Sequence, residues 1–126
     1  LAASVSEPFS GIMRIGIIPT IAPYLLPALL PAIKQHYPKL KLYIREGQSR
    51  VIYEQLNMGE LDLVLYAQPF SMPHVEAVPM QNDLFHFAYN KNAEQSLKFN
   101  KQGEIDFNAM DPESLLLLED GHCLRE

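Results

Sequence analysis

The sequence predicts an α/β fold built on a parallel sheet, and three observations support this prediction. Apolar segments at 12–18, 40–46 and 61–66 are rich in Ile, Leu, Val and Tyr, which is typical of β-strands. Two segments with helical spacing of their apolar residues, 21–37 and 49–58, separate them. The order strand, helix, strand, helix, strand is typical of parallel strands joined by right-handed crossovers.

The first strand and helix follow a short polar lead-in. Ile12–Ile18 is almost continuously apolar, which predicts a strand buried on both faces. The helix predicted over 21–37 contains three prolines at a spacing of four. Pro23 fits a helix start, whereas Pro27 or Pro31 is expected to kink the helix or mark a restart.

One face of this helix collects four apolar side chains, which are Leu26, Leu29, Leu30 and Ile33. Such a stripe is usually packed against the core of the domain. It could instead serve, in part, as a surface through which two copies pair. The sequence does not separate these two interpretations.

The second strand and helix are predicted with equal detail. Leu40–Glu46 alternates between apolar and polar residues, as a half-buried strand does. Ser49 is the expected N-cap of the next helix, and Gly59 suits its end. The expected buried positions of that helix are Val51, Ile52, Leu56 and Met58.

The pattern changes after Pro69. Short strands are expected at Glu76–Met80 and Phe85–Tyr89, followed by an exposed polar excursion over 90–103. Asp111-Pro112-Glu113 predicts a capped helical turn. The run Leu115–Leu118 predicts a buried strand, with Glu119–Glu126 following its carboxyl end.

Composition limits the class of protein. The 126 residues are 48% hydrophobic, enough for one ordinary domain with a core. A net charge of −5 and a pI near 5.3 disfavour direct binding to nucleic acid or to a membrane surface. No run approaches the ~18 apolar residues of a spanning helix. The start lacks the features of a signal peptide, and a single cysteine favours a reducing, cytoplasmic location.

Three motifs resemble one family. The segments 16–27, with Gly-Ile-Ile-Pro-Thr-Ile-Ala-Pro-Tyr-Leu-Leu-Pro, and 46–62, with Glu-Gly-Gln-Ser and Gln-Leu-Asn-Met-Gly-Glu-Leu-Asp, are similar to the effector-binding domain of LysR-type transcription regulators. The third segment, 117–125, reads Leu-Leu-Glu-Asp-Gly-His-Cys-Leu-Arg. It resembles the active-site segment of the OxyR-type peroxide sensors within that family.

The resemblance implies a periplasmic-binding-protein-like effector domain, in which two α/β subdomains enclose a cleft. It implies that residues 1–10 end a linker, that 11–86 form the first part of subdomain I, which is Rossmann-like, and that 87–126 begin subdomain II, so that the domain is truncated. The family forms dimers or tetramers and contacts DNA through a winged helix-turn-helix that this chain does not contain. Its second, resolving cysteine would follow residue 126.

Cys123 is the candidate reactive group. A thiolate is the nucleophile toward peroxide, and the neighbouring His122 and Arg125 could stabilise its negative charge. The motif also follows a predicted strand, where function gathers in open α/β sheets. A lone cysteine is otherwise most often an inert core residue. The resemblance implies oxidation to a sulfenic acid, which a second thiol would trap as a disulfide.

Thr20 and Ser49 are the candidate ligand-binding hydroxyls, with Pro19 and Gln48 beside them. Each hydroxyl lies just after a predicted strand and just before a helix, where unpaired N–H groups can bind an anion or a small polar ligand. The resemblance implies that they hold the peroxide and a water. Both residues could instead only cap their helices, and the two roles are compatible.

The sequence predicts no cofactor and no metal site. His122 with Cys123 do not supply the three or four ligands that a metal needs, and the other histidines are scattered. Adjacent Glu119 and Asp120 are interpreted as turn residues.

The expected function is non-enzymatic sensing of hydrogen peroxide by a DNA-binding regulator; the alternative is an effector domain that binds a small organic acid in the cleft. A thiol peroxidase and a transport-type solute-binding protein are less consistent with the sequence.

Overall fold

The computed structural model describes residues 8–117, which form two compact units, 8–73 and 74–117. The predicted Cys123 motif and the predicted strand residue Leu118 lie outside the described residues. The predicted subdomain boundary after residue 86 and the predicted linker at 1–10 stay predictions.

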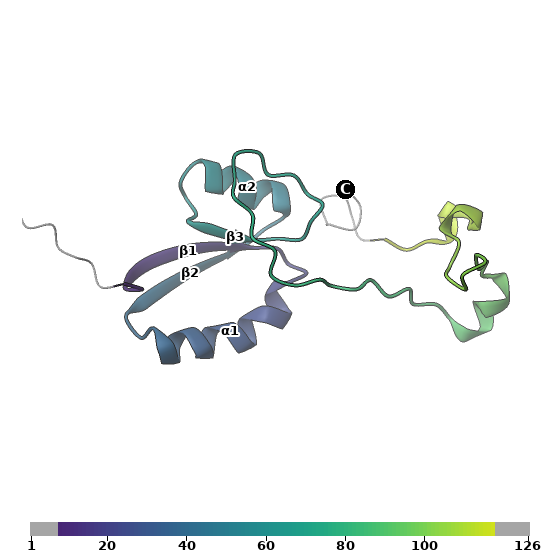
Figure 1. Ribbon diagram of the computed structural model, residues 1–126, viewed down its shortest axis with the longest axis horizontal. Coiled ribbons are helices and arrows are strands. Elements are labelled where there is room, and N and C mark those ends of the chain that lie inside the picture. The colour runs from purple at the N-terminus through teal and green to yellow at the C-terminus, as the bar shows by residue number, and fades with distance from the viewer. Residues whose placement is uncertain (1–7, 118–126) are drawn as a thin grey trace, which may run out of the picture. The chain divides into compact units, whose positions relative to one another are not determined.

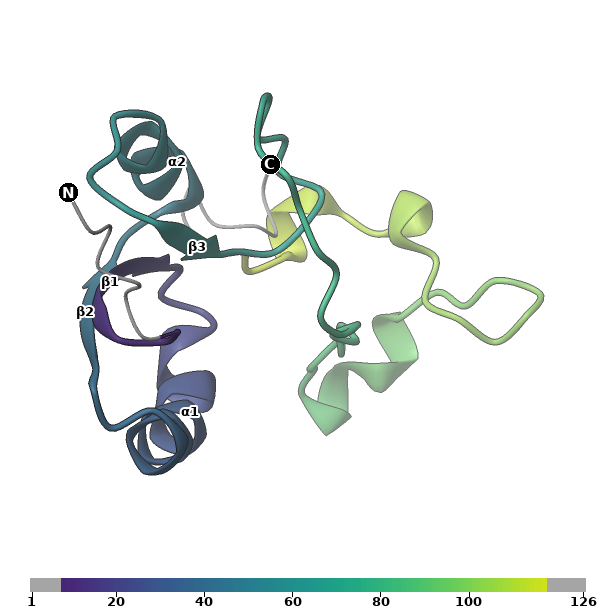
Figure 2. The ribbon, with the colours of Figure 1, turned by 60° about the vertical axis from the view of Figure 1, so that its left-hand side comes forward.

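The first unit is the predicted α/β arrangement. Its elements are β1 (Gly11–Ile17), α1 (Ala22–His36), β2 (Leu40–Glu46), α2 (Ser49–Asn57) and β3 (Leu63–Leu65). The sheet order is β2-β1-β3, and both pairings are parallel. The two helices lie on opposite faces of the sheet (Figures 1 and 2). The prediction of a parallel sheet with crossover helices is therefore confirmed.

Helix α1 runs without a break through Pro27 and Pro31, so of the two predicted alternatives, a kink or a restart, the restart is wrong. Both prolines are exposed, as is Pro23 near the helix start. A spacing of four places all three on the same side of the helix. Because that side faces solvent, water can satisfy the carbonyls that the missing N–H groups leave free. The helix ends where predicted, with the Tyr37 N–H donating to the carbonyl of Ile33.

Helix α2 begins one residue earlier than predicted. Its N-cap is Gln48, and Ser49 is the first helical residue, whose side chain makes no capping hydrogen bond. The prediction of Ser49 as N-cap is therefore wrong. Ser49 instead lies on the buried side of the helix, four residues before the partly buried Tyr53.

The predicted buried positions of α2 are half correct. Ile52 is fully buried and Leu56 is partly buried, whereas Val51 and Met58 are exposed. The buried side follows the spacing 49, 52, 56, and this spacing turns residues 51 and 58 away from the sheet. Gly59, with a φ of +73°, ends the helical segment as predicted.

Strand β3 is shorter than the predicted 61–66 because the carboxylate of Asp62, and not a backbone carbonyl, accepts one of the hydrogen bonds that would pair the strands. The Asp62 N–H donates to the Arg14 carbonyl at 2.8 Å, and the Arg14 N–H donates to the Asp62 carboxylate Oδ2 at 2.7 Å. The carboxylate thus takes the donor that a strand carbonyl would take. At the other end, Tyr66 and Ala67 leave the strand and pack against the core.

The core beneath α2 consists of Ile18, Ile52 and Leu61, all buried. Gly16, on strand β1 of the sheet, lies next to Ile52 and Leu61 of this cluster. A Cβ at residue 16 would come within 2.7 Å of Leu61 Cδ1 and 3.0 Å of Ile52 Cβ. Only glycine therefore allows α2 to approach β1 this closely.

We expect Gly16→Ala to destabilise the domain by about 1–3 kcal/mol, because one extra methyl overpacks a filled core. Gly59→Asn is the matched control, since no atom lies within 4 Å of a Cβ there and Asn tolerates the left-handed conformation. Urea unfolding of both variants measures the difference. Equal midpoints for the two variants would contradict the close approach of α2.

The second unit contains only short helical turns and one isolated antiparallel bridge, Phe99 to Ile105, within residues 74–117. Its 3₁₀ helices are η1 (Lys91–Ser96), η2 (Phe107–Ala109) and η3 (Pro112–Ser114). The last confirms the predicted turn, since the Asp111 carboxylate caps it by accepting from the Glu113 N–H at 3.1 Å.

The strands predicted in this unit are wrong for the described residues. Neither Glu76–Met80 nor Phe85–Tyr89 forms a strand, and the described part of Leu115–Leu118 has Leu116 fully exposed. A strand needs a neighbour that accepts its backbone hydrogen bonds. No such neighbour is paired with these segments within residues 74–117, so their apolar pattern alone does not make them strands.

Candidate functional site

The carboxyl ends of the three strands meet at one edge of the sheet. Ile17, the last residue of β1, is paired with Glu46 of β2 and Leu65 of β3. Two hydrogen bonds extend this alignment beyond the strands: the Gly47 N–H donates to the Ile17 carbonyl at 3.0 Å, and the Ile18 N–H donates to the Leu65 carbonyl at 3.2 Å. The segments that lead into α1 and α2 therefore begin side by side.

Pro19 and Thr20 form the turn between β1 and α1, and both are partly buried. The backbone N–H groups at the start of α1 already have hydrogen-bond acceptors. The N–H groups of Ile21, Ala22, Tyr24 and Leu25 all donate to backbone carbonyls, at 3.0 or 3.1 Å. Residue 23 is a proline and has no N–H. Among residues 21–25 no N–H remains for a ligand, so on this side the hydroxyl of Thr20 is the available polar group.

The start of α2 is different. The Ile52 N–H donates to the Gln48 carbonyl at 3.1 Å, as the first bond of the helix. The N–H groups of Ser49, Arg50 and Val51 make no backbone hydrogen bond within residues 8–117. They carry the positive end of the helix dipole. The expectation of two helix starts with unpaired N–H groups is thus correct for α2 and wrong for α1.

Three side chains surround the start of α2. Ser49 is 1% exposed, whereas Gln48 is exposed. Arg50 is exposed and pairs with Glu54 one turn along the helix, with 3.3 Å between Nε and Oε1. Chemically, this end of α2 is suited to hold an oxygen-rich ligand through N–H groups, with a hydroxyl and a guanidinium close in sequence.

The structure brings the predicted ligand-binding segments, Pro19-Thr20 and Gln48-Ser49, to the same edge of the sheet. Cys123, His122 and Arg125 lie outside the described residues. Their place relative to this edge, and therefore their predicted roles, stay predictions.

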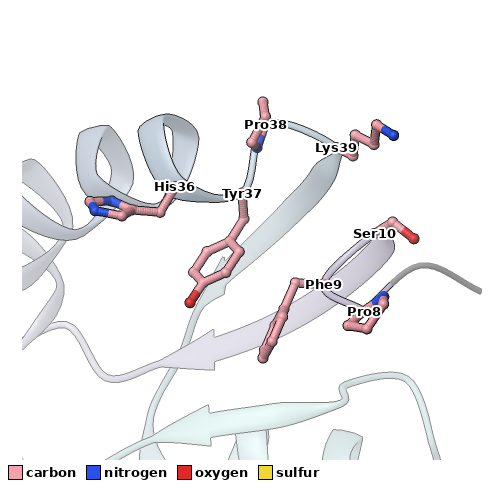
Figure 3. Close-up of a pocket in the computed structure, with 7 residues that line it drawn as sticks. All are labelled: Pro8, Phe9, Ser10, His36, Tyr37, Pro38 and Lys39. Carbon is pink, nitrogen blue, oxygen red and sulfur yellow. The ribbon is translucent and has the colours of Figure 1, made fainter.

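Two hollows in the first unit lie elsewhere. One, of about 150 Å³, is formed by Pro8–Ser10 and by His36–Lys39 after α1. The rings of Phe9 and Tyr37 face each other there, with 4.7 Å between centroids (Figure 3). The other, of about 300 Å³, lies between α1 and β2 and is lined by Leu30, Ile33, Lys34, Pro38, Leu40 and Leu42. Neither contains Thr20 or Ser49.

The first hollow is too small for a typical organic ligand, whose pockets span roughly 300–1,000 Å³. Phe9 has a left-handed backbone, with a φ of 58°, and the contact of its tilted ring with Tyr37 stabilises this unfavourable conformation. The sequence does not predict this pair, because a Phe next to Ser-Gly carries no signal that its ring contacts a tyrosine 28 positions later.

Within residues 8–117, no group of three or more His, Cys, Asp or Glu side chains is arranged to hold a metal ion. No helix there has the length and apolar character needed to cross a membrane.

Comparison with known proteins gives the family. The LysR substrate binding domain matches residues 6–126. The HTH-type transcriptional regulator EstR of Acinetobacter baylyi is 36% identical over 126 residues, which are 100% of this chain and 40% of that protein. The probable hydrogen peroxide-inducible genes activator of Streptomyces viridosporus is 38% identical over 125 residues, 99% of this chain and 39% of that protein.

A solved structure agrees with these relatives. An OxyR2 regulatory domain variant from Vibrio vulnificus superposes with a TM-score of 0.76 and 34% identity. The match covers 92% of this chain and 54% of that one. The chain thus spans about 40% of the length of these curated relatives. On the family match and on identities above 30% across its whole length, the chain belongs to the LysR substrate-binding domain family and resembles the regulatory domains of its OxyR members.

Proposed function

We propose that this chain is the regulatory part of a LysR-type transcription factor that responds to hydrogen peroxide through Cys123. The supporting observation is the coincidence of two facts. The chain is 38% identical, over nearly its whole length, to a probable hydrogen peroxide-inducible activator, and its single cysteine lies in the Gly-His-Cys-Leu-Arg motif. The proposal includes a homo-oligomeric, cytoplasmic protein that binds DNA outside this chain and is not an enzyme.

The proposed reaction begins with the Cys123 thiolate. Its sulfur attacks one oxygen of hydrogen peroxide, the O–O bond breaks, and hydroxide leaves and takes up a proton to become water. The sulfur is oxidised to a sulfenic acid and the peroxide is reduced. In this scheme His122 and Arg125 favour the thiolate by their positive charge or hydrogen bonds. A thiol outside this chain would then form the disulfide.

Thr20 and Ser49 are proposed to hold the peroxide. They lie on neighbouring segments at one sheet edge, and the start of α2 adds three N–H groups without backbone partners in the described residues. Such donors stabilise the negative charge that develops on the leaving oxygen. The start of α2 is proposed to contribute more hydrogen bonds to the peroxide than the start of α1, because residues 21–25 have no N–H left to donate.

The test of the proposed function identifies the product. The full-length regulator is treated with one equivalent of hydrogen peroxide, and sulfenic acid is trapped with a dione reagent and mapped by peptide mass spectrometry. We expect the adduct on Cys123. An unmodified Cys123 together with an oxidised cysteine elsewhere in the protein would refute the assignment.

We expect Ser49→Ala to slow the oxidation of Cys123 by roughly 10- to 150-fold, since one hydrogen bond to a charged group is worth about 1.5–3 kcal/mol. Ser71→Ala is the control, because Ser71 is exposed in the segment after β3. The measurement is the loss of free thiol in the full-length regulator under excess peroxide. Equal rates for the two variants would remove Ser49 from the peroxide site.

A second candidate function is binding of a small organic acid at the same edge. The specific observation is the start of α2, whose N–H groups and buried Ser49 suit a carboxylate. A cleft ligand stabilises the folded state by mass action, so thermal unfolding against a panel of organic acids tests it. A raised melting temperature that Ser49→Ala abolishes supports this candidate; no shift with any acid rejects it.

A further inference from the structure

The segment that follows β3 is fastened to α2 by one tyrosine. Residues Tyr66–Pro73, here called the connecting strap, begin at the carboxyl edge of the sheet and end at the last residue of the first unit. The hydroxyl of Tyr53 on α2 donates to the carbonyl of Pro73 at 3.0 Å. The ring of Tyr53 also meets Phe70 edge to face, with 6.4 Å between centroids.

The two ends of the strap are held differently. At its start, Tyr66 and Ala67 pack against the cluster of Ile18, Ile52 and Leu61. Toward its end, Met72 is only 8% exposed, whereas Ser71 and Pro73 are exposed. The hydrogen bond from Tyr53 is thus the polar contact that fixes the exposed end, at the point where the chain leaves the first unit.

The residue after the strap is conformationally unfavourable. His74 has a φ of 63°, in the left-handed region that a non-glycine residue rarely adopts. Such a conformation persists only where the neighbouring structure enforces it. Because Pro73 is held by Tyr53, the hydroxyl of Tyr53 is well placed to enforce it.

Tyr53 also lies on the same helix as Ser49 of the candidate site. It lies four residues after Ser49, one turn further along the same side of α2. We propose that Tyr53 is a latch: its hydroxyl holds the connecting strap against α2, and opening of this latch sets how readily the link between the two units rearranges when the site reacts. The latch itself stands on the contacts described; its role in the response rests on the proposed function.

Tyr53→Phe in the full-length regulator tests the latch, because it removes the hydroxyl and keeps the ring beside Phe70. Tyr24→Phe is the matched control, since Tyr24 is 85% exposed on α1. The readout is the rate of chymotrypsin cleavage after Phe70 under native conditions, followed by mass spectrometry. Cleavage after Phe85, which is exposed in the second unit, serves as the internal reference.

We expect Tyr53→Phe to speed cleavage after Phe70 by about three- to tenfold relative to cleavage after Phe85, as loss of one neutral hydrogen bond predicts. Tyr24→Phe should leave the ratio unchanged. An unchanged rate of cleavage after Phe70 in Tyr53→Phe would overturn the latch. Equal acceleration after Phe70 and Phe85 would also overturn it, because it indicates general destabilisation.

The second readout concerns the response. We expect Tyr53→Phe to keep the rate of Cys123 oxidation and to shift the peroxide concentration that gives a half-maximal change in DNA binding, by up to the same factor as the cleavage rate. Faster cleavage with an unshifted response would overturn the regulatory role. If Cys123 of the unaltered protein does not react, the proposed function fails, and the cleavage ratio alone decides whether the latch exists.

Discussion

Replacing Cys123 with Ser should abolish the transcriptional response to hydrogen peroxide. Serine keeps the size of the side chain, but a hydroxyl cannot form the thiolate that attacks peroxide or the sulfenic acid that results. The chain contains no other cysteine that could substitute. Genome-wide transcript levels before and after a short peroxide pulse, in cells carrying either protein, measure the effect.

The control for this prediction is another oxidisable sulfur. Met58 is 66% exposed at the end of α2, and methionine also reacts with peroxide. Met58→Leu should keep the full response. A response that survives in Cys123→Ser but disappears in Met58→Leu would assign the sensing to methionine and reject the proposed chemistry.

Ile52→Ala should destabilise the first unit by about 2–5 kcal/mol. Ile52 is fully buried, and its atoms lie against the backbone positions of both Gly16 and Gly47. Since both glycines place backbone rather than side chain beside it, the neighbours have few atoms with which to fill the cavity.

Val51→Ala is the matched control, because Val51 is adjacent on α2 and 45% exposed. We expect it to change stability by less than about 1 kcal/mol. Urea unfolding of the two variants, followed by fluorescence or circular dichroism, gives the comparison. Similar losses in both variants would indicate that α2 does not pack as described.

The first unit could be predicted from sequence because its strands and helices pack against elements that are close to them in the chain. Strand β1, which is buried only in its second half, and alternating β2 are adjacent in the sheet, and each crossover helix brings the next strand back beside β1. The errors concern single residues whose role depends on their neighbours. Serine is a common N-cap residue, yet Ser49 is the first helical residue of α2 and lies on the buried side of the helix.

The second unit could not be predicted because a strand depends on a partner. Phe85–Tyr89 has the composition of a strand, but Phe87 packs instead on Tyr89 and Phe107, with centroid distances of 6.1 and 5.8 Å. Asp111 was predictable, since its cap involves a residue only two positions away. A hydrogen bond between residues that are close in the chain can be predicted from the local sequence, whereas strand pairing depends on segments that are distant in the sequence.

The sequence predicts that the two candidate ligand-binding segments are neighbours, but it does not predict their hydrogen bonds. Strand ends identify Thr20 and Ser49 as neighbours at one edge, because parallel strands align their carboxyl ends. The sequence does not show that the turn at Ile18 uses the N–H groups at the start of α1, while those of α2 stay unpaired within the backbone of the described residues. Nor does it show that Tyr53 reaches Pro73.

The central claim is that Cys123 is a peroxide sensor rather than an inert core cysteine. The most direct test is the second-order rate constant for oxidation of Cys123 in the full-length regulator at limiting peroxide, followed by quantitative mass spectrometry with free cysteine as a competitor in the same solution. We predict that Cys123 is oxidised much faster than free cysteine at neutral pH. Oxidation no faster than that of free cysteine would contradict the claim.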